Sequence, residues 1–308
     1  MKIFSIGAGF VSEHLEFPTI DSRLDFTSQS IEKMLEQYKP DTLINCIGKT
    51  GRPNVDWCES HREETAAINV ALPILLAEAC AKHSIHLIQI SSGCIFFGES
   101  PNFHYVQADG SAMPDNFGGS FSLRMPTRKI DDGWKEDDFA NPQSYYSKSK
   151  YACDLMLGQM PHVSNLRIRM PISSKNNPRN LINKLRVYKK IINIPNSMTF
   201  MDDLVKCVSW VAKNGHTGIF HVVNPEPLTA TRIMKEYCKY VPDHTFDILH
   251  TEEELDKLTT AKRSNCILDS NKLKWAGFEM TPSEEALSQC MKQYVANIQL
   301  GNKCQTKI

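Results

Sequence analysis

Short apolar segments alternate with segments of helical periodicity along the first half of this chain, and this alternation is what most constrains the fold. Each apolar segment ends at turn residues, which is typical of a buried strand. The segments between them carry apolar residues three and four positions apart, which predicts helices. Strands that alternate with helices favour a parallel sheet covered on both faces. We therefore predict a doubly wound α/β fold, with strands at 2–7, 15–21, 41–48, 85–92 and 163–170 and helices at 30–39, 63–83 (kinked at Pro73) and 141–160.

The second half of the chain has a different pattern. Amphipathic helices are predicted beside a single strand, at 201–213, 228–241 and 281–298 with the strand at 218–224. A chain of 308 residues can form one large domain or two ordinary ones. We expect a dinucleotide-binding domain from residues 1–170, to which 199–225 return. Residues 171–198 and 226–298 are expected to form a smaller substrate-binding domain, and 299–308 a frayed polar tail.

Composition argues against several classes of function. Lys plus Arg and Asp plus Glu number 35 each, so the zero net charge favours neither nucleic acid nor a membrane surface as a partner. No apolar run has the length of a membrane-spanning helix, and the N-terminal sequence lacks the pattern of a signal peptide. The ten cysteines include no C-x-x-C pair, and the histidines show no metal-binding spacing. We expect reduced thiols, a cytoplasmic location and no metal site.

The sequence GAGFVS at 7–12 follows the first predicted strand and opens a helix. It fits the dinucleotide-binding motif G-x-G-x-x-G, except that Ser12 stands in place of the third glycine. That glycine serves the packing of the helix on the strand, so the turn and the approach of a pyrophosphate are unaffected. An ordinary strand-to-helix turn is the alternative. Beyond the second strand, Arg23 favours the 2′-phosphate of NADP, whereas Asp21 would suit the ribose of NAD and a solvated arginine would bind neither.

The sequence QSYYSKSK at 143–150 contains a tyrosine that can do chemistry. Tyr146 and Lys150 are four positions apart and so share a helix face, whereas Tyr145 has only Ser149 at that spacing. A nearby lysine favours the phenolate, and the tyrosine can then pass a proton to or from a carbonyl or hydroxyl oxygen. Spacing alone leaves open a polar helix without a chemical role.

Four local pieces occur in the order found in extended short-chain dehydrogenases/reductases: NCIG (45–48), Asn69, ISSGCIF (90–96) and YSKSK (146–150). Two longer strings, GRPNVDWCES and RMPISS, resemble the nucleotide-rhamnose synthases (epimerase-reductases) of plants and giant viruses. These proteins are related to bacterial dTDP-4-dehydrorhamnose reductase. The resemblance spans nearly the whole chain.

The resemblance implies a two-part reaction on a small-molecule partner. The substrate would be a UDP- or dTDP-linked 4-keto-6-deoxyglucose, epimerised at C3 and C5 and then reduced at C4 with NADPH to nucleotide-linked L-rhamnose. NADH as the cofactor and a homodimer as the assembly are further possibilities that the resemblance leaves open. The C4 carbonyl acidifies the protons on C3 and C5, and inversion needs an acid/base pair on opposite faces of the ring.

The resemblance also assigns residues to these steps. Ser92, Tyr146 and Lys150 match the reductase group, and Cys94 and Lys184 match the proton-transfer pair. The alternatives are a buried structural cysteine and a solvated helix lysine. The expected cofactor-binding residues are Gly7, Gly9, Phe10, Val11, Arg23, Cys46, Gly48, Lys49, Asn69, Tyr146, Lys150 and Pro171.

The substrate is expected to contact a second group, in which arginines suit a diphosphate and a structural salt bridge is the alternative for each. These residues are Arg52, Asn54, Ser92, Asn177, Arg179 and Arg263.

Two departures from the family pattern qualify this picture. The first helix is shorter than expected, and the connection from Cys94 to Tyr146 is longer than in the plant proteins. That connection is either a lid or binding loop or a surface excursion without a role. A plain 4-keto-sugar reductase, with Cys94 and Lys184 idle, is one alternative function. A non-catalytic nucleotide-binding regulator on the same fold is another.

Overall fold

Six parallel strands form the central sheet, in the order β11-β7-β4-β3-β1-β2. The computed structural model describes residues 1–20, 27–107 and 127–305. The predicted doubly wound fold is confirmed, because the strand order reverses direction beside β1. The strands are β1 (Ile3–Ile6), β2 (Thr19–Ile20), β3 (Thr42–Asn45), β4 (His86–Ser92), β7 (Val163–Ile168) and β11 (Gly218–His221).

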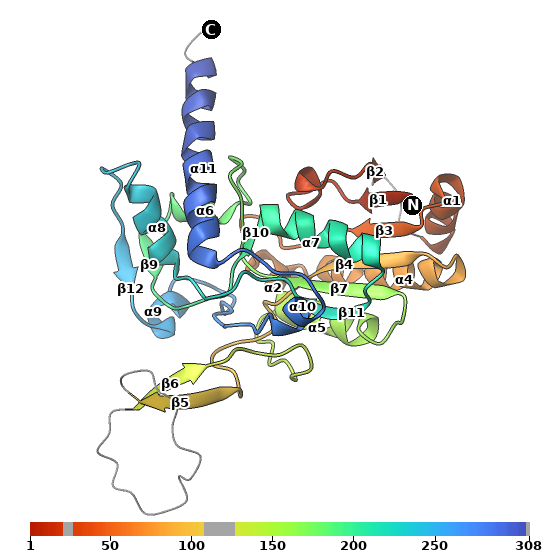
Figure 1. The fold of residues 1–308 in the computed structure, drawn as a ribbon, viewed down its shortest axis with the longest axis horizontal. Helices are drawn as coiled ribbons and strands as arrows, with labels where there is room; N and C mark the ends of the chain where they lie inside the picture. Colours follow the sequence, from red (N-terminus) through yellow and green to blue (C-terminus); the bar gives the residue numbers. More distant parts are fainter. Residues whose placement is uncertain (21–26, 108–126, 306–308) are drawn as a thin grey trace, which may run out of the picture.

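Helices cover both faces of this sheet (Figure 1). On one face α1 (Ser28–Tyr38), α4 (Leu72–Lys82) and α5 (Tyr145–Leu157) bury apolar side chains against the strands. On the other face α7 (Met201–Asn214) packs against Phe10, Ile44 and Ile90. The alternation of buried strands and one-sided helices in the sequence thus builds two apolar layers around one sheet.

The segment after the glycine turn forms only a 3-10 helix, η1 (Ser12–His14). The sequence indicated a first helix that is shorter than in the family, and the structure confirms this. The strand β2 has only two residues, where the sequence predicted a strand over 15–21. Asp21 and Arg23 lie outside the described residues.

The segment 62–82 contains α3 (Arg62–Ala66), a π-helical turn η2 (Ala67–Ala71) and α4. Pro73 is the second residue of α4 and comes directly after the π-helical turn; prolines and π-helical turns are both places where helices kink, so the kink expected at Pro73 stays a prediction. By length and composition alone Arg62–Lys82 is apolar enough to cross a membrane. Leu72, Leu76 and Cys80 are instead buried against the sheet, as in the core helix of a doubly wound fold.

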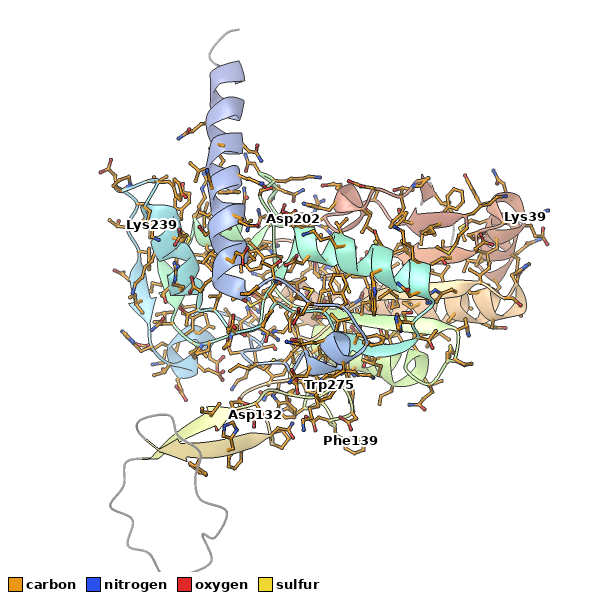
Figure 2. All side chains as sticks on the ribbon, viewed as in Figure 1. Lys39, Asp132, Phe139, Asp202, Lys239 and Trp275 are labelled. Carbon is orange, nitrogen blue, oxygen red and sulfur yellow. The ribbon has the colours of Figure 1, made fainter. Side chains whose placement is uncertain are left out.

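The second half of the chain has its own apolar core, built around Ile172, Ile182, Met234 and Tyr294. Its elements are β8 (Pro171–Ile172), α6 (Leu181–Leu185), β9 (Lys190–Ile192), β10 (Thr199–Phe200), α8 (Ala230–Cys238), β12 (Asp247–Leu249), α9 (Glu252–Asp256) and α11 (Ser283–Gln305). Figure 2 shows the length of the body, with Lys39 after α1 at one end and Lys239 after α8 at the other.

Two features of this half differ from expectation. Leu273 of the helix α10 (Asn271–Trp275) packs into the core of the first half, and Met280 packs there too. Both residues fall in the range 226–298, which was expected to belong to the substrate-binding domain. The helix α11 continues to Gln305, so most of the expected frayed tail is helical. The two-domain division otherwise follows the two cores and stays a prediction.

An antiparallel hairpin of β5 (Phe103–Gln107) and β6 (Thr127–Asp131) interrupts the first half, in the long connection. In Figure 1 this hairpin projects away from the body of the protein. Residues 108–126 lie outside the described residues.

Candidate active site

A pocket of about 430 Å³ lies at the carboxyl ends of the strands β1, β3, β4 and β7. Gly9, Ser92 and Tyr146 line it from the first half, and Lys184 and Asn265 line it from the second half. Open parallel sheets bind their ligands at this edge, near the reversal of strand order. The pocket therefore stands where the fold predicts the site.

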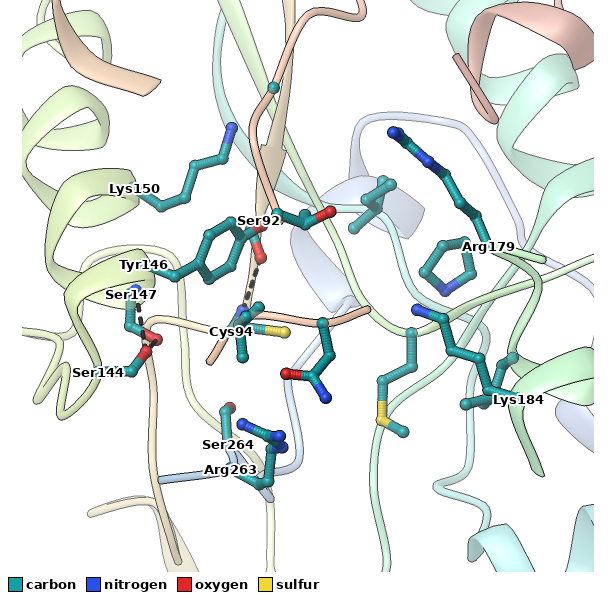
Figure 3. Close-up of a pocket in the computed structure, with 18 of the residues that line it drawn as sticks. Ser92, Cys94, Ser144, Tyr146, Ser147, Lys150, Arg179, Lys184, Arg263 and Ser264 are labelled. Atoms are coloured by element: carbon teal, nitrogen blue, oxygen red, sulfur yellow. Dashed lines mark hydrogen bonds between the residues drawn. The ribbon is translucent and has the colours of Figure 1, made fainter. Parts of the chain in front are cut away.

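Ser92, Tyr146 and Lys150 meet on one side of the pocket (Figure 3). Ser92 is the last residue of β4. The side chain of Ser144 accepts a hydrogen bond from the N–H of Ser147 (3.1 Å) and caps α5, so Tyr146 stands in the first turn and Lys150 one turn later. Tyr146 is only 8% exposed and Lys150 only 6%. The structure thus brings the three expected reductase residues together.

Burial governs the electrostatics of this group. Burial raises the pKa of Tyr146, as does the neighbouring Cys94, while a hydrogen bond with Ser92 opposes them. Burial also lowers the pKa of Lys150, whose amine has no hydrogen-bond partner among the described residues. Lys150 is not among the causes that shift Tyr146, so the effect expected of the lysine on the phenol stays a prediction.

The proposed acid/base pair spans the two halves. Cys94 follows β4 in a turn held by its own N–H, which donates to Ser92 Oγ (3.1 Å). Lys184 stands in α6, capped by Asn180, on the other side of the pocket. Figure 3 shows the Cys94 thiol and the Lys184 amine pointing toward one another across the space between them.

The pKa of Lys184 is lowered by burial first, and then by the positive charges of Arg179 and Arg263. The charge of Cys94 acts in the opposite direction, which places the thiol within electrostatic reach of the amine. A lowered pKa gives the amine a larger neutral fraction near neutral pH, which a general base requires. Lys184 is therefore not the solvated helix lysine that was its alternative.

The glycine turn fits a dinucleotide. Gly7 has φ +106°, and a Cβ there would lie 2.8 Å from Ile47 Cγ1, so a side chain is excluded. Ser12 Oγ accepts from the N–H of Gly9 (2.8 Å) and donates to its carbonyl oxygen (2.9 Å), which closes the turn. The amine of Lys150 lies 3.3 Å from where a Cβ on Gly48 would be, so a side chain at Gly48 would crowd this amine.

Most of the expected cofactor residues line the pocket. Those that do are Gly9, Phe10, Val11, Cys46, Gly48, Tyr146, Lys150 and Pro171. Gly7, Lys49 and Asn69 do not. The side chain of Asn69 accepts from the N–H of Lys49 (2.8 Å) and donates to its carbonyl (2.9 Å), so Asn69 holds the backbone beside Gly48. Lys49 pairs with Glu64 instead of entering the pocket.

The expected substrate residues divide in the same way. Asn54, Arg179 and Arg263 line the pocket together with Ser92, whereas Arg52 and Asn177 do not. Arg263 donates to both carboxylate oxygens of Asp56 (2.7 and 2.9 Å), so it makes the salt bridge that was its alternative. The hydrogen bonds that Asp56 accepts from Arg263 and from the N–H of Ala261 hold the pKa of Asp56 low against its burial.

Arg169 is a residue of the site that sequence reasoning missed. It is buried behind the turn that carries Cys94 and donates to Gly93 O (3.3 Å), Asn196 Oδ1 (2.5 Å) and both oxygens of Ser264 (2.6 and 2.9 Å). Among the described residues no carboxylate pairs with it. Its place in the string RMPISS gave no signal, because these partners are distant in sequence. Arg169 fixes the turn that presents Cys94.

The described residues of the long connection between Phe97 and Pro142 do not line this pocket. No residue of 97–107 or 127–142 lines it. The described part of the connection therefore favours the surface excursion over the lid. Among residues 1–20, 27–107 and 127–305, no group of three His, Cys, Asp or Glu side chains is placed to hold a metal ion.

Comparison with known proteins places this arrangement in a family. Residues 8–296 match the RmlD substrate binding domain. A bifunctional dTDP-4-dehydrorhamnose 3,5-epimerase/dTDP-4-dehydrorhamnose reductase of Arabidopsis thaliana is 38% identical over 262 residues, which are 84% of this chain and 79% of the relative. The match thus includes both halves that form the pocket.

Solved structures share the fold. The UDP-rhamnose synthase L780 of Acanthamoeba polyphaga mimivirus superposes with a TM-score of 0.79 at 26% identity, covering 94% of this chain and 99% of the other. A dTDP-4-dehydrorhamnose reductase of Bacillus anthracis, solved in complex with NADP, gives a TM-score of 0.74 at 18% identity, covering 94% and 97%. The resemblance and the fold read from the sequence are both confirmed. The chain is an enzyme, and it belongs to the RmlD substrate binding domain family.

Proposed function

We propose that this enzyme epimerises C3 and C5 of a UDP- or dTDP-linked 4-keto-6-deoxyglucose and reduces C4 with NADPH to give the nucleotide-linked L-rhamnose. One observation carries the proposal: Cys94 and Lys184 face one another across the same pocket that holds Ser92, Tyr146 and Lys150. A plain reductase needs the latter group alone.

The epimerisation follows from the placement of the pair. Neutral Lys184 takes the proton from a carbon beside the C4 carbonyl, and the electron pair of that C–H bond forms an enolate with its charge on O4. Ser92 and Tyr146 stand where their hydroxyls can donate to that oxygen. The Cys94 thiol returns a proton from the opposite face, which inverts the carbon. Proton exchange with solvent restores the pair for the second carbon.

The reduction uses the other group. NADPH supplies a hydride to C4 when it is bound. Tyr146 donates its hydroxyl proton to O4, which turns the carbonyl into a hydroxyl. Ser92 holds that oxygen, and the unpartnered amine of Lys150 is free to bind a ligand hydroxyl beside Gly48.

The test is a turnover assay with un-epimerised 4-keto-6-deoxyglucose linked to UDP or to dTDP, with NADPH or NADH. The proposal expects a product inverted at C3 and C5 and carrying deuterium at both carbons when the reaction runs in D₂O. A reduced product that keeps both centres would identify a plain 4-keto-sugar reductase. Cofactor binding without oxidation of NADPH by either sugar would favour the non-catalytic regulator.

A further inference from the structure

The glycine turn offers little positive charge of its own. The helix η1 that follows it has three residues, so the macrodipole that usually faces a pyrophosphate is small. The N–H of Gly9 already donates to Ser12. The imidazole of His14 is bonded to Phe10 O and to Ser173 Oγ, and burial lowers its pKa. A pyrophosphate at this turn therefore needs a cation from elsewhere.

Arg179, from the second half of the chain, reaches this turn. Its NH1 lies 3.8 Å from the position that a Cβ on Gly9 would occupy, and it lines the pocket. Its side chain has no hydrogen bond or ion pair with any described residue; only its backbone N–H is bonded, to Asn177 Oδ1 (2.9 Å). Figure 3 shows the guanidinium extended away from Cys94 and from Arg263.

The segment that carries Arg179 is tied to the residues after the turn. Lys175 Nζ donates to Glu13 O (2.8 Å), and Asn177 Nδ2 donates to Glu13 Oε2 (3.1 Å). His14 Nε2 bonds Ser173 Oγ (2.6 Å). These contacts hold the backbone of Arg179 beside the glycine turn, although the two segments are more than 150 residues apart in sequence.

We infer that Arg179 binds the pyrophosphate of the dinucleotide cofactor and not the diphosphate of the sugar nucleotide, so that the second half of the chain completes the cofactor site. The inference rests on the proposed function for the class of cofactor, and it replaces the substrate contact first expected for this residue. A guanidinium suits this role because it forms forked, charge-assisted hydrogen bonds to phosphate oxygens.

The experiment measures binding without turnover. Purified wild-type protein and Arg179→Gln are titrated with NADPH, followed by nicotinamide fluorescence, and separately with UDP and dTDP by calorimetry. Loss of charge-assisted bonds to one phosphate group raises the Kd for NADPH by about 10- to 100-fold. The Kd for UDP and dTDP stays within about twofold. Reduced nicotinamide riboside, which lacks both phosphates of the pyrophosphate, loses no affinity.

Lys235→Gln is the matched control, because it removes one charge from an exposed lysine of the same half, on α8. It leaves the NADPH affinity unchanged. The variant Arg179→Lys keeps the charge without the fork and recovers only part of the affinity. Arg179 has no side-chain partner among the described residues, so the unfolding temperature of Arg179→Gln should equal that of the wild type.

Three results would overturn the inference. Weaker UDP and dTDP binding with unchanged NADPH binding would return Arg179 to the substrate, and unchanged binding of all ligands would leave it no role. A wild type that binds no NADPH would overturn both this inference and the proposed function. If NADPH binding responds as expected but the sugars are not epimerised, only the proposed function fails.

Discussion

The two sides of the pocket are built differently. Ser92, Tyr146 and Lys150 stand on the long regular elements β4 and α5 of the first half. Arg179 and Lys184 come from a loop and the five-residue helix α6 of the second half. The first side is positioned by the sheet, whereas the second depends on side-chain contacts such as those of Lys175 and Asn177 with Glu13.

This difference separates two kinds of chemistry. The reductase group lies within one half of the chain, so reduction can survive the loss of Lys184 on the opposite side. Inversion of a carbon needs groups on both faces of the ring, and Cys94 and Lys184 supply them from different halves. The acid/base chemistry of epimerisation therefore depends directly on how the two halves meet.

The largest expected effect comes from the first side. Tyr146→Phe removes the proton donor, so reduction of pre-epimerised 4-keto-rhamnose with NADPH falls by about 10²- to 10⁴-fold. Solvent deuterium still enters C3 and C5, because Cys94 and Lys184 are intact, but more slowly, because Ser92 alone then donates to O4. Stopped-flow absorbance of NADPH and mass spectrometry of the sugar measure the two steps. A near-normal reduction rate would remove Tyr146 from the mechanism.

Arg169 tests the support beneath the first side. Arg169→Met removes the guanidinium donor from the Ser264 carbonyl oxygen and one of the two donors to Asn196 Oδ1, which keeps the N–H of Cys266, so the free energy of unfolding falls by about 3 kcal/mol. The matched change Arg62→Met removes an exposed arginine whose Nε donates to Glu59 O (3.2 Å), and it costs at most about 1 kcal/mol. Urea unfolding followed by circular dichroism compares them, and equal losses would contradict the bracing role of Arg169.

The pH dependence of proton exchange tests the second side. Exchange at C3 and C5 needs neutral Lys184, so its rate rises with pH through the pKa of Lys184, which burial and the charges of Arg179 and Arg263 lower. Arg179→Gln removes one of these cations, so the pKa of Lys184 rises and the rising part of the pH–rate profile moves to higher pH. The rate is measured without NADPH, by NMR in D₂O.

Lys235→Gln is the control for this shift, since its lysine is exposed on α8 and makes no contact in the pocket. If the rising part of the pH–rate profile does not shift in Arg179→Gln, then either Lys184 is not the base or the charge of Arg179 does not act on it.

Much of the first side could be predicted from the sequence. The periodicity located α5, and the spacing of Tyr146 and Lys150 placed both on one face, because these are local properties of the chain. The strand and its terminal Ser92 were predicted for the same reason.

The second side could not be predicted in the same way. The pairing of Arg263 with Asp56 joins residues 207 positions apart, and no local pattern distinguishes it from a phosphate contact. The burial of Arg169 and the approach of Arg179 to Gly9 likewise depend on how the halves pack. The bond between Lys49 and Asn69, which is buried in the π-helical turn before Pro73, likewise joins residues that no local pattern pairs.

The separation of the two activities at Cys94 tests the central claim most directly. The measurement is the incorporation of solvent deuterium at C3 and C5 by Cys94→Ala, beside its rate of reduction of pre-epimerised 4-keto-rhamnose with NADPH. We predict that inversion and reprotonation are abolished, while reduction continues at a rate close to that of the wild type. Equal loss of both activities, or inversion that persists without the thiol, would contradict the proposal that one pocket holds two separable sets of catalytic residues.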